Sequence, residues 1–303
     1  MSKESTTILE PVVDPGFITT PYIKELMEFS LNYLKADLPI HFSGPAGTGK
    51  SALAFHVAAA LKRPIIMIHG DEEFRTSDLV GAESGMHRSR VRDEYIHSVK
   101  KLEEHISPSW VDNRLTVACK YGFTLIYDEF TRSRPEANNA LLAVLEEKML
   151  DLPPGAGEER YLKVHPNFRA IFTSNPAEYA GVYTAQDALR DRLVTIELNA
   201  FDEATEIAIT QKRTGVSVED AKSIVKIVRG YRDKMEGKAV VGVRDAIKIA
   251  KTLKGRHSHP DKKDQIFMRI CQHILTSNHR MPGASVRTNK KGDLVSNLIR
   301  MHA

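Results

Sequence analysis

Short apolar runs alternate with stretches of helical periodicity through the first two thirds of the chain. Strands are expected at residues 40–43, 65–69, 123–127, 169–174 and 193–198, with helices at 51–62, 76–82, 135–149 and 186–191. Apolar strands that alternate with helices are typical of a parallel sheet covered on both faces. The pattern therefore predicts an α/β fold with a five-stranded parallel sheet.

The pattern changes on both sides of this α/β domain, which we place at residues 21–199. Residues 1–20 carry prolines and a glycine without periodicity, which indicates a flexible N-terminal arm. Residues 200–277 are helical throughout and predict a small all-α domain. Residues 278–303 are expected to be a C-terminal tail, a linker followed by a short final helix.

Several local signals mark where individual helices begin. Pro21 suits the first position of a helix, because proline has no N–H to lose there. Ser217 followed by Asp220 has the form of a capping box. Apolar spacing predicts further helices at 243–254 and 262–276.

The stretch between the second and third strands is longer than a plain crossover needs, so we assign an insertion to residues 84–107. Arginines and lysines are interleaved there with aspartates and glutamates. This composition favours a solvated helix face. A pore loop or a partner surface is the alternative.

Composition and charge exclude several classes of protein. The chain has 303 residues, of which 42% are apolar and 27% charged, as in soluble globular proteins. The net charge of +4 does not call for a nucleic-acid or membrane partner. Cys119 and Cys271 follow no metal-ligand spacing and suit a reducing cytosol. A polar N-terminus and the lack of a long apolar run predict neither a signal peptide nor a transmembrane segment.

A complete phosphate-binding motif follows the first expected strand and opens a helix. Its small residues let backbone N–H groups surround phosphate oxygens, and the helix N-terminus attracts the anion. Lys50 is placed to reach the β- and γ-phosphates, and Ser51 to ligate Mg²⁺. The motif consists of Gly44, Pro45, Ala46, Gly47, Thr48, Gly49, Lys50 and Ser51. It predicts a nucleotide site that binds ATP or GTP with Mg²⁺.

Two carboxylates end the third expected strand. The carboxyl ends of parallel strands meet at one edge of a doubly wound sheet, so this pair is expected beside the phosphate loop. Asp128 is then placed to hold Mg²⁺, and Glu129 to orient and deprotonate the attacking water. Asn175 follows the fourth strand and is placed to hydrogen-bond that water or the γ-phosphate. Together these residues predict hydrolysis as well as binding.

Three arginines near the last strand and the helical region are candidate phosphate ligands. Arg190 and Arg192 fit a finger that completes a neighbouring subunit's site, which can raise the rate by orders of magnitude. They fit equally well as surface residues that pair with nearby aspartates. Arg244, at the start of an expected helix, fits a γ-phosphate ligand or an exposed helix-start residue.

The order of these motifs resembles that of AAA+ ATPases, and within them the MoxR branch. Residues 129–137, Glu-Phe-Thr-Arg-Ser-Arg-Pro-Glu-Ala, are similar to that branch's Asp-Glu-Ile-Asn-Arg-Ala-Pro run, and Arg132 falls on its arginine. The run that ends at Leu193 resembles one ending in Asp-Arg-Phe, so Arg192 rather than Arg190 takes the finger position. The resemblance implies an AAA+ core followed by a helical lid domain.

Within that branch the chain resembles the GvpN family of gas-vesicle proteins. The most distinctive stretch is His69-Gly-Asp-Glu-Glu-Phe74, and the resemblance covers roughly residues 20–255. It implies an ATPase needed to build gas vesicles, active as a homo-oligomer, a hexameric ring. Other gas vesicle proteins are its implied partners, in the cytoplasm or on the vesicle. The related CbbQ and NorQ families, which activate metalloenzymes with a von Willebrand-type partner, supply the alternative function.

Two mechanisms fit these motifs. An ATPase would remodel or assemble vesicle proteins, whereas an adaptor would use nucleotide binding only to set its conformation. Glu129 and Arg192 favour the ATPase, because a protein that only binds nucleotide needs neither residue.

Overall fold

The computed structural model describes residues 8–12, 16–93, 101–153, 160–175, 187–235, 241–277 and 288–303. For the part of this set between residues 82 and 111, it describes the backbone alone. Three expected features lie partly outside this set: the start of the N-terminal arm, the middle of the insertion at 94–100, and the linker at 278–287. Within the described part of the chain, no helix combines the length and apolarity that crossing a bilayer requires.

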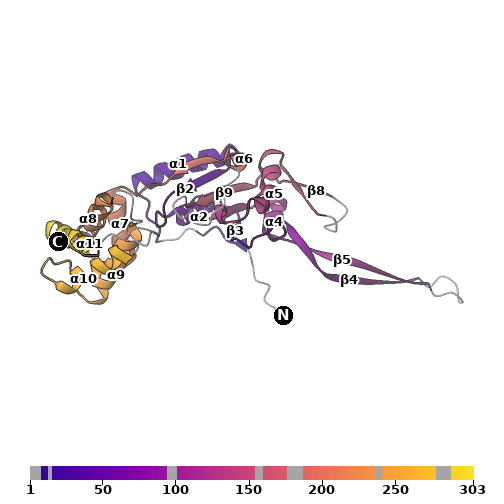
Figure 1. Ribbon diagram of the computed structural model, residues 1–303. Helices are drawn as coiled ribbons and strands as arrows, with labels where there is room; N and C mark the ends of the chain where they lie inside the picture. The colour runs from indigo at the N-terminus through magenta and orange to yellow at the C-terminus, as the bar shows by residue number, and fades with distance from the viewer. Residues whose placement is uncertain are drawn as a thin grey trace.

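A six-stranded sheet in the order β1-β3-β6-β9-β2-β10 forms the centre of the molecule (Figure 1). The five parallel strands that the sequence predicts are confirmed. Residues of the arm add a short antiparallel edge strand, in which Ile8 pairs with Ile66. The strands are β1 (Ile8–Leu9), β2 (Ile40–Ser43), β3 (Ile65–His69), β6 (Thr124–Asp128), β9 (Arg169–Ser174) and β10 (Val194–Glu197).

Helices cover both faces of this sheet. Alternation along β6 shows the two layers, because Leu125 and Tyr127 pack into one core while Ile126 packs into the other. The layer of Ile126 contains α1 (Pro21–Lys35) and α2 (Lys50–Ala60). The opposite layer contains α3 (Thr76–Val80), α4 (Arg114–Tyr121) and α5 (Pro135–Glu146). The start of α1 at Pro21 is confirmed, with Thr20 as its N-cap.

The insertion is a long antiparallel hairpin, β4 (Gly81–Asp93) with β5 (Lys101–Asp112), that leaves the body of the molecule (Figure 1). The expectation of a helix face at residues 84–107 is therefore wrong. Arg88, Arg90 and Arg92 recur with a period of two, which matches a strand and not a helix. A second hairpin, β7 (Met149–Asp151) with β8 (Tyr161–Lys163), follows α5 and shortens that helix relative to the prediction.

Five helices after β10 pack around a second core at one end of the molecule (Figure 1). They are α7 (Glu203–Thr214), α8 (Val218–Lys234), α9 (Val243–Gly255), α10 (Gln265–Ser277) and α11 (Thr288–His302). Val295, Leu298 and Ile299 of α11 belong to this core, so the described part of the expected tail packs with the other helices. Ser217 caps α8 by accepting from the Asp220 N–H, while the Asp220 carboxylate contacts His259 instead of closing the capping box.

Candidate functional site

The loop between β2 and α2 curls back over its own backbone. The ammonium group of Lys50 is buried and donates to the carbonyl oxygens of Gly44 and Pro45, each at 2.7 Å. Gly44 needs to be glycine, because a Cβ there would lie 2.1 Å from the Leu198 carbonyl oxygen. Gly49 adopts a left-handed φ of 77° just before α2, a conformation that other residues rarely take. A glycine-containing loop that leads into a helix N-terminus is the arrangement that binds phosphate in other proteins.

Asp128, at the end of β6, lies directly beside this loop. Its Oδ1 accepts from Ser51 Oγ at 2.7 Å and from Thr173 Oγ1 at 2.5 Å. Its Oδ2 is 3.5 Å from Nδ1 of the exposed His69. A hydroxyl and a carboxylate in contact are the hard oxygen ligands that Mg²⁺ binds, so Ser51 and Asp128 fit that ion.

Glu129 has a strained backbone and an occupied carboxylate. Its φ of 54° is left-handed, which is uncommon outside glycine and clusters at functional sites. Its N–H donates to Thr173 Oγ1 at 3.0 Å, and this bond holds the turn against β9. Arg132, in the short helix η1 (Phe130–Arg132), donates from Nη1 to Glu129 Oε2 at 2.6 Å. The guanidinium group of Arg132 thus forms an ion pair with the carboxylate of Glu129.

A cavity of about 430 Å³ separates the phosphate loop from the helical bundle. Its polar lining includes Lys50, Ser51, Asp128, Glu129 and Asn175. Its apolar lining consists of Phe17, Ile18, Ile23, Phe201, Ile209, Val243 and Ile247. A pocket that combines polar and apolar walls suits a nucleotide, whose phosphates need polar partners and whose base needs apolar contact.

Two arginines of the helical bundle line the same cavity. Arg244, at the start of α9, lies over the phosphate loop, since a Cβ on Gly47 would be 3.3 Å from its Cδ. Arg213, near the end of α7, was missed by the sequence analysis. No local motif marks it, because only the packing of α7 against α9 brings it to the cavity.

Arg190 and Arg192 are the two candidates for the arginine finger. Neither is among the described residues that line the cavity of their own chain. Arg192 donates from Nε to Glu146 Oε2 at 2.7 Å and from Nη1 to the Ala188 carbonyl. Its described acidic partner is thus Glu146 of α5, rather than a neighbouring aspartate. Arg190, the last residue of α6 (Asp187–Arg190), lies near the buried His41.

His41 joins three strands beneath the site, and the sequence analysis did not single it out. Its Nε2 lies 2.8 Å from Ser174 Oγ, next to Asn175, and its Nδ1 lies 3.1 Å from Thr195 Oγ1. Its ring lies edge-on to the ring of Phe130, with 5.2 Å between the ring centroids. Burial first, then the charges of Arg190 and Lys50, lowers the pKa of His41 to about 4. His41 is therefore neutral at pH 7.

The strand order, the phosphate loop, the acidic pair and the helical bundle define an AAA+ ATPase. Residues 39–193 match the model of the AAA domain (dynein-related subfamily). The fold is similar to that of NtrX from Brucella abortus, solved in complex with ADP. The TM-score is 0.54 at 15% identity, over 94% of this chain and 64% of that chain.

Sequence comparison identifies the family more closely. The gas vesicle ATPase GvpN of Ancylobacter aquaticus is 48% identical over 91% of this chain and 77% of its own length. GvpN of Haloferax mediterranei is 42% identical over 86% of this chain and 74% of its own length. NorQ of Paracoccus denitrificans is 24% identical over 65% of this chain and 66% of its own length. The chain belongs to the gas vesicle ATPase GvpN family.

Proposed function

We propose that this ATPase hydrolyses ATP in the cavity between the phosphate loop and the helical bundle, and that it acts in gas vesicle formation. The contact of Ser51 with Asp128, in the polar lining of that cavity, carries the proposal. It supports a Mg²⁺ site beside the phosphate loop, and Glu129 in the same cavity supports hydrolysis rather than binding alone. The 48% identity to a gas vesicle ATPase supports the cellular role.

Each residue of the site has a role that follows from its position. Ser51 and Asp128 would hold Mg²⁺, which offsets phosphate charge when it is bound. Lys50 exchanges its two carbonyl partners for phosphate oxygens, because its ammonium group already lies within the loop. Asn175 orients the attacking water, and Arg244 approaches the phosphates from the helical bundle over Gly47. The apolar side chains that line the cavity hold the base.

Glu129 acts as the general base of this site. Its carboxylate must first leave Arg132, because the ion pair keeps Oε2 of Glu129 from contacting a water. Both side chains are partly exposed, so this ion pair is weak and separates easily. Arg132 therefore controls whether the Glu129 carboxylate is available as the general base, and it does not itself bind phosphate.

We propose a homo-oligomeric ring, with hexamer as the expected size. Arg192 supports this arrangement, because it is a partly exposed arginine that lies outside the cavity of its own chain. An arginine in that position can reach the phosphates of a neighbouring subunit. The expected partners are other gas vesicle proteins in the cytoplasm or on the vesicle, with no role for nucleic acid.

Removal of the gene from a vesicle-forming cell tests the cellular role. We expect vesicles to be lost or to remain small, and we expect the wild-type gene, but not Lys50→Ala, to restore them. An Arg256→Met variant serves as the control, because Arg256 pairs with Asp264 in the helical bundle outside the cavity. Full-sized, buoyant vesicles in the deletion strain would remove the vesicle assignment. Activation of a metalloenzyme, the alternative that the resemblance to NorQ and CbbQ implies, would then be the function to test next; these two relatives are 24% and 22% identical to the chain.

A further inference from the structure

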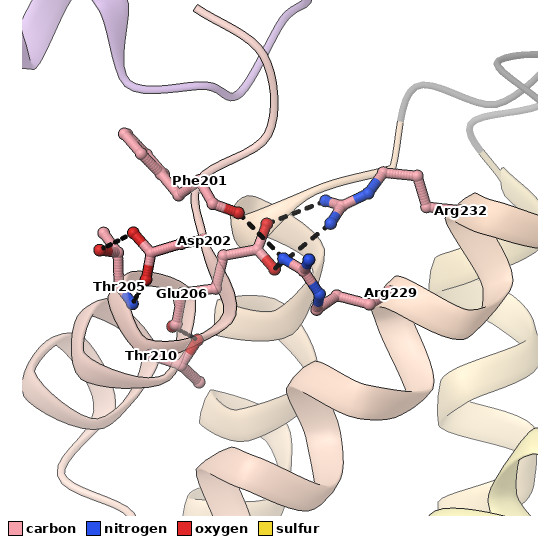
Figure 2. A network of polar contacts seen from close by, with 7 residues as sticks. All are labelled: Phe201, Asp202, Thr205, Glu206, Thr210, Arg229 and Arg232. Carbon is pink, nitrogen blue, oxygen red and sulfur yellow. Dashed lines mark hydrogen bonds and ion pairs between the residues drawn. The ribbon is translucent and has the colours of Figure 1, made fainter. Parts of the chain in front are cut away.

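A buried carboxylate connects two helices of the bundle (Figure 2). The side chain of Glu206, in the first turns of α7, is only 3% exposed. Arg232 of α8 donates to Glu206 Oε1 at 2.9 Å and to Oε2 at 3.4 Å. Arg229, one turn earlier on α8, donates to Oε2 at 2.9 Å. Two guanidinium groups thus enclose one carboxylate.

Stability alone is a weak reason for such an arrangement. Removing a carboxylate and two guanidinium groups from water has a desolvation cost that their attraction does not reliably exceed. Well-packed apolar side chains of similar volume often stabilise a core equally well or better. A positional role for at least one of these charged groups explains the arrangement better.

The two arginines differ in one contact. Arg229 also donates from Nη1 to the carbonyl oxygen of Phe201, at 2.9 Å (Figure 2). The described contacts of Arg232 within this network are to Glu206 alone. Of these two arginines, only Arg229 has a described contact that connects α8 to the segment leading from β10 into α7.

Phe201 occupies the point where that segment meets the phosphate loop. Its ring lines the cavity, and a Cβ on Gly49 would lie 3.2 Å from its Cζ. Gly49 directly precedes Lys50, so a shift of the ring changes the space that is available to the loop. The chain of contacts thus runs from α8 through the Arg229 guanidinium and the Phe201 backbone to the Phe201 ring and Gly49.

We propose that Arg229, oriented by Glu206, is a positioning residue for the nucleotide site: it fixes Phe201 against the phosphate loop and so couples the helical bundle to nucleotide affinity. The inference rests on the proposed location of the nucleotide in the cavity. The geometry assigns the coupling to Arg229, whereas Arg232 only balances the charge of Glu206. The two arginines therefore form a matched pair for a test.

The experiment compares Arg229→Met with Arg232→Met, using mant-ADP as the probe and thermal unfolding without nucleotide as the second readout. Each variant leaves Glu206 with one guanidinium, so both should lower the Tm similarly. We expect Arg229→Met to weaken mant-ADP binding about tenfold, a typical size for coupling between sites, and Arg232→Met to change it less than about twofold. If the two substitutions acted only by destabilising the helical bundle, both variants would lose mant-ADP affinity to the same extent.

A double-mutant cycle with Phe201→Ala identifies the route. If the coupling passes through the ring, Arg229→Met causes no further loss of mant-ADP affinity in the Phe201→Ala background. Equal affinities for the two methionine variants, or an undiminished effect of Arg229→Met without the ring, would overturn the inference. Should Arg229→Met not fold, Arg229→Lys replaces it, because the shorter lysine side chain does not place its ammonium where Nη1 of Arg229 donates to both the Phe201 carbonyl and Glu206.

Lys50→Ala separates this inference from the proposed site. Loss of mant-ADP binding in Lys50→Ala, with equal effects of the two methionine variants, rejects the coupling alone. Unchanged mant-ADP binding in Lys50→Ala rejects the nucleotide site and the coupling with it.

Discussion

The hydroxyl of Ser51 lies 2.7 Å from Oδ1 of Asp128, although 77 positions separate the two residues in the chain. The contact exists because β2 and β6 are both parallel strands of one sheet, each adjacent to β9, so their carboxyl ends meet at the same edge. Thr173 of β9 donates to the same carboxylate oxygen and holds it toward α2. This contact joins the nucleotide loop to the acidic pair and is the basis of the first prediction.

Ser51→Ala removes one of the two proposed protein ligands of Mg²⁺. We expect the Mg²⁺ concentration for half-maximal ATPase activity to rise at least about tenfold, a change typical of a lost metal-ligand interaction. Binding of mant-ADP in EDTA should stay unchanged, because the loop and Lys50 remain. Ser30→Ala is the control, since Ser30 Oγ donates within α1 to the Leu26 carbonyl. An unchanged Mg²⁺ requirement in Ser51→Ala would place the ion elsewhere.

Glu129→Gln keeps the shape of the side chain and removes its basicity. We expect ATP to bind normally and phosphate release to fall by about 10²- to 10⁴-fold, the usual contribution of a general base. The measurement is single-turnover phosphate release under saturating ATP. Glu136→Gln provides a control, because Glu136 is an exposed carboxylate in the first turn of α5. Phosphate release at the wild-type rate in Glu129→Gln would remove Glu129 from the mechanism.

Arg132→Ala releases the carboxylate that Glu129 contributes to the site. Because Arg132 occupies Glu129 Oε2 at 2.6 Å, we expect the variant to hydrolyse ATP two- to threefold faster, about the factor expected of a weak exposed pair. ATP affinity should not change, since Arg132 is not among the described residues that line the cavity. A large loss of turnover in Arg132→Ala would instead show that Arg132 contacts the phosphates of a neighbouring subunit.

Arg192→Ala should bind ATP normally and lose hydrolysis only in the assembled oligomer. Mixing it with Glu129→Gln tests the action between subunits, because each variant supplies the group that the other lacks. We expect both pure samples to be inactive and the mixture to regain part of the ATPase activity. Arg190→Ala replaces Arg192→Ala in a parallel mixture as the control. Because Arg190→Ala keeps Arg192, it should be active without mixing. An inactive Arg190→Ala sample that regains activity with Glu129→Gln, beside a fully active Arg192→Ala sample, would transfer the finger role to Arg190.

His41 predicts a stability change in mild acid. The pKa of its folded-state imidazole is about 4, against 6.5 for an unperturbed histidine, so the unfolded chain binds the extra proton first as pH falls. The native state therefore loses stability between pH 6.5 and about 4, by on the order of 3 kcal/mol from this group, and no more below that range. Urea unfolding at several pH values measures the loss, and His41→Gln should flatten the curve in this window. A wild-type curve as flat as that of His41→Gln would contradict the low pKa.

The sequence by itself determined the parts of this protein that depend on contiguous residues. The run from Gly44 to Ser51, Asp128-Glu129 at a strand end, and five apolar strands separated by helices follow from backbone chemistry and periodicity. These features were enough to predict a parallel α/β sheet with a nucleotide-hydrolysis site, because each motif imposes its local structure. The AAA+ assignment came from the resemblance of their order to that family. Even the error at the insertion was local, since the period-two arginines of β4 were already visible in the sequence.

Tertiary structure alone decided which distant residues share the site. Arg213 and Phe201 reach the cavity only because the helical bundle folds back over the phosphate loop, and Phe17 reaches it because the arm stacks on His56. In the sequence His41 is an ordinary strand residue. The structure shows that its Nε2 lies beside Ser174 Oγ of another strand. Such contacts arise from packing between elements far apart in the chain, and no local pattern encodes them. The phosphate loop and the acidic pair beside it were therefore predictable from sequence, whereas the contributions of Phe17, Phe201 and Arg213 to the cavity were not.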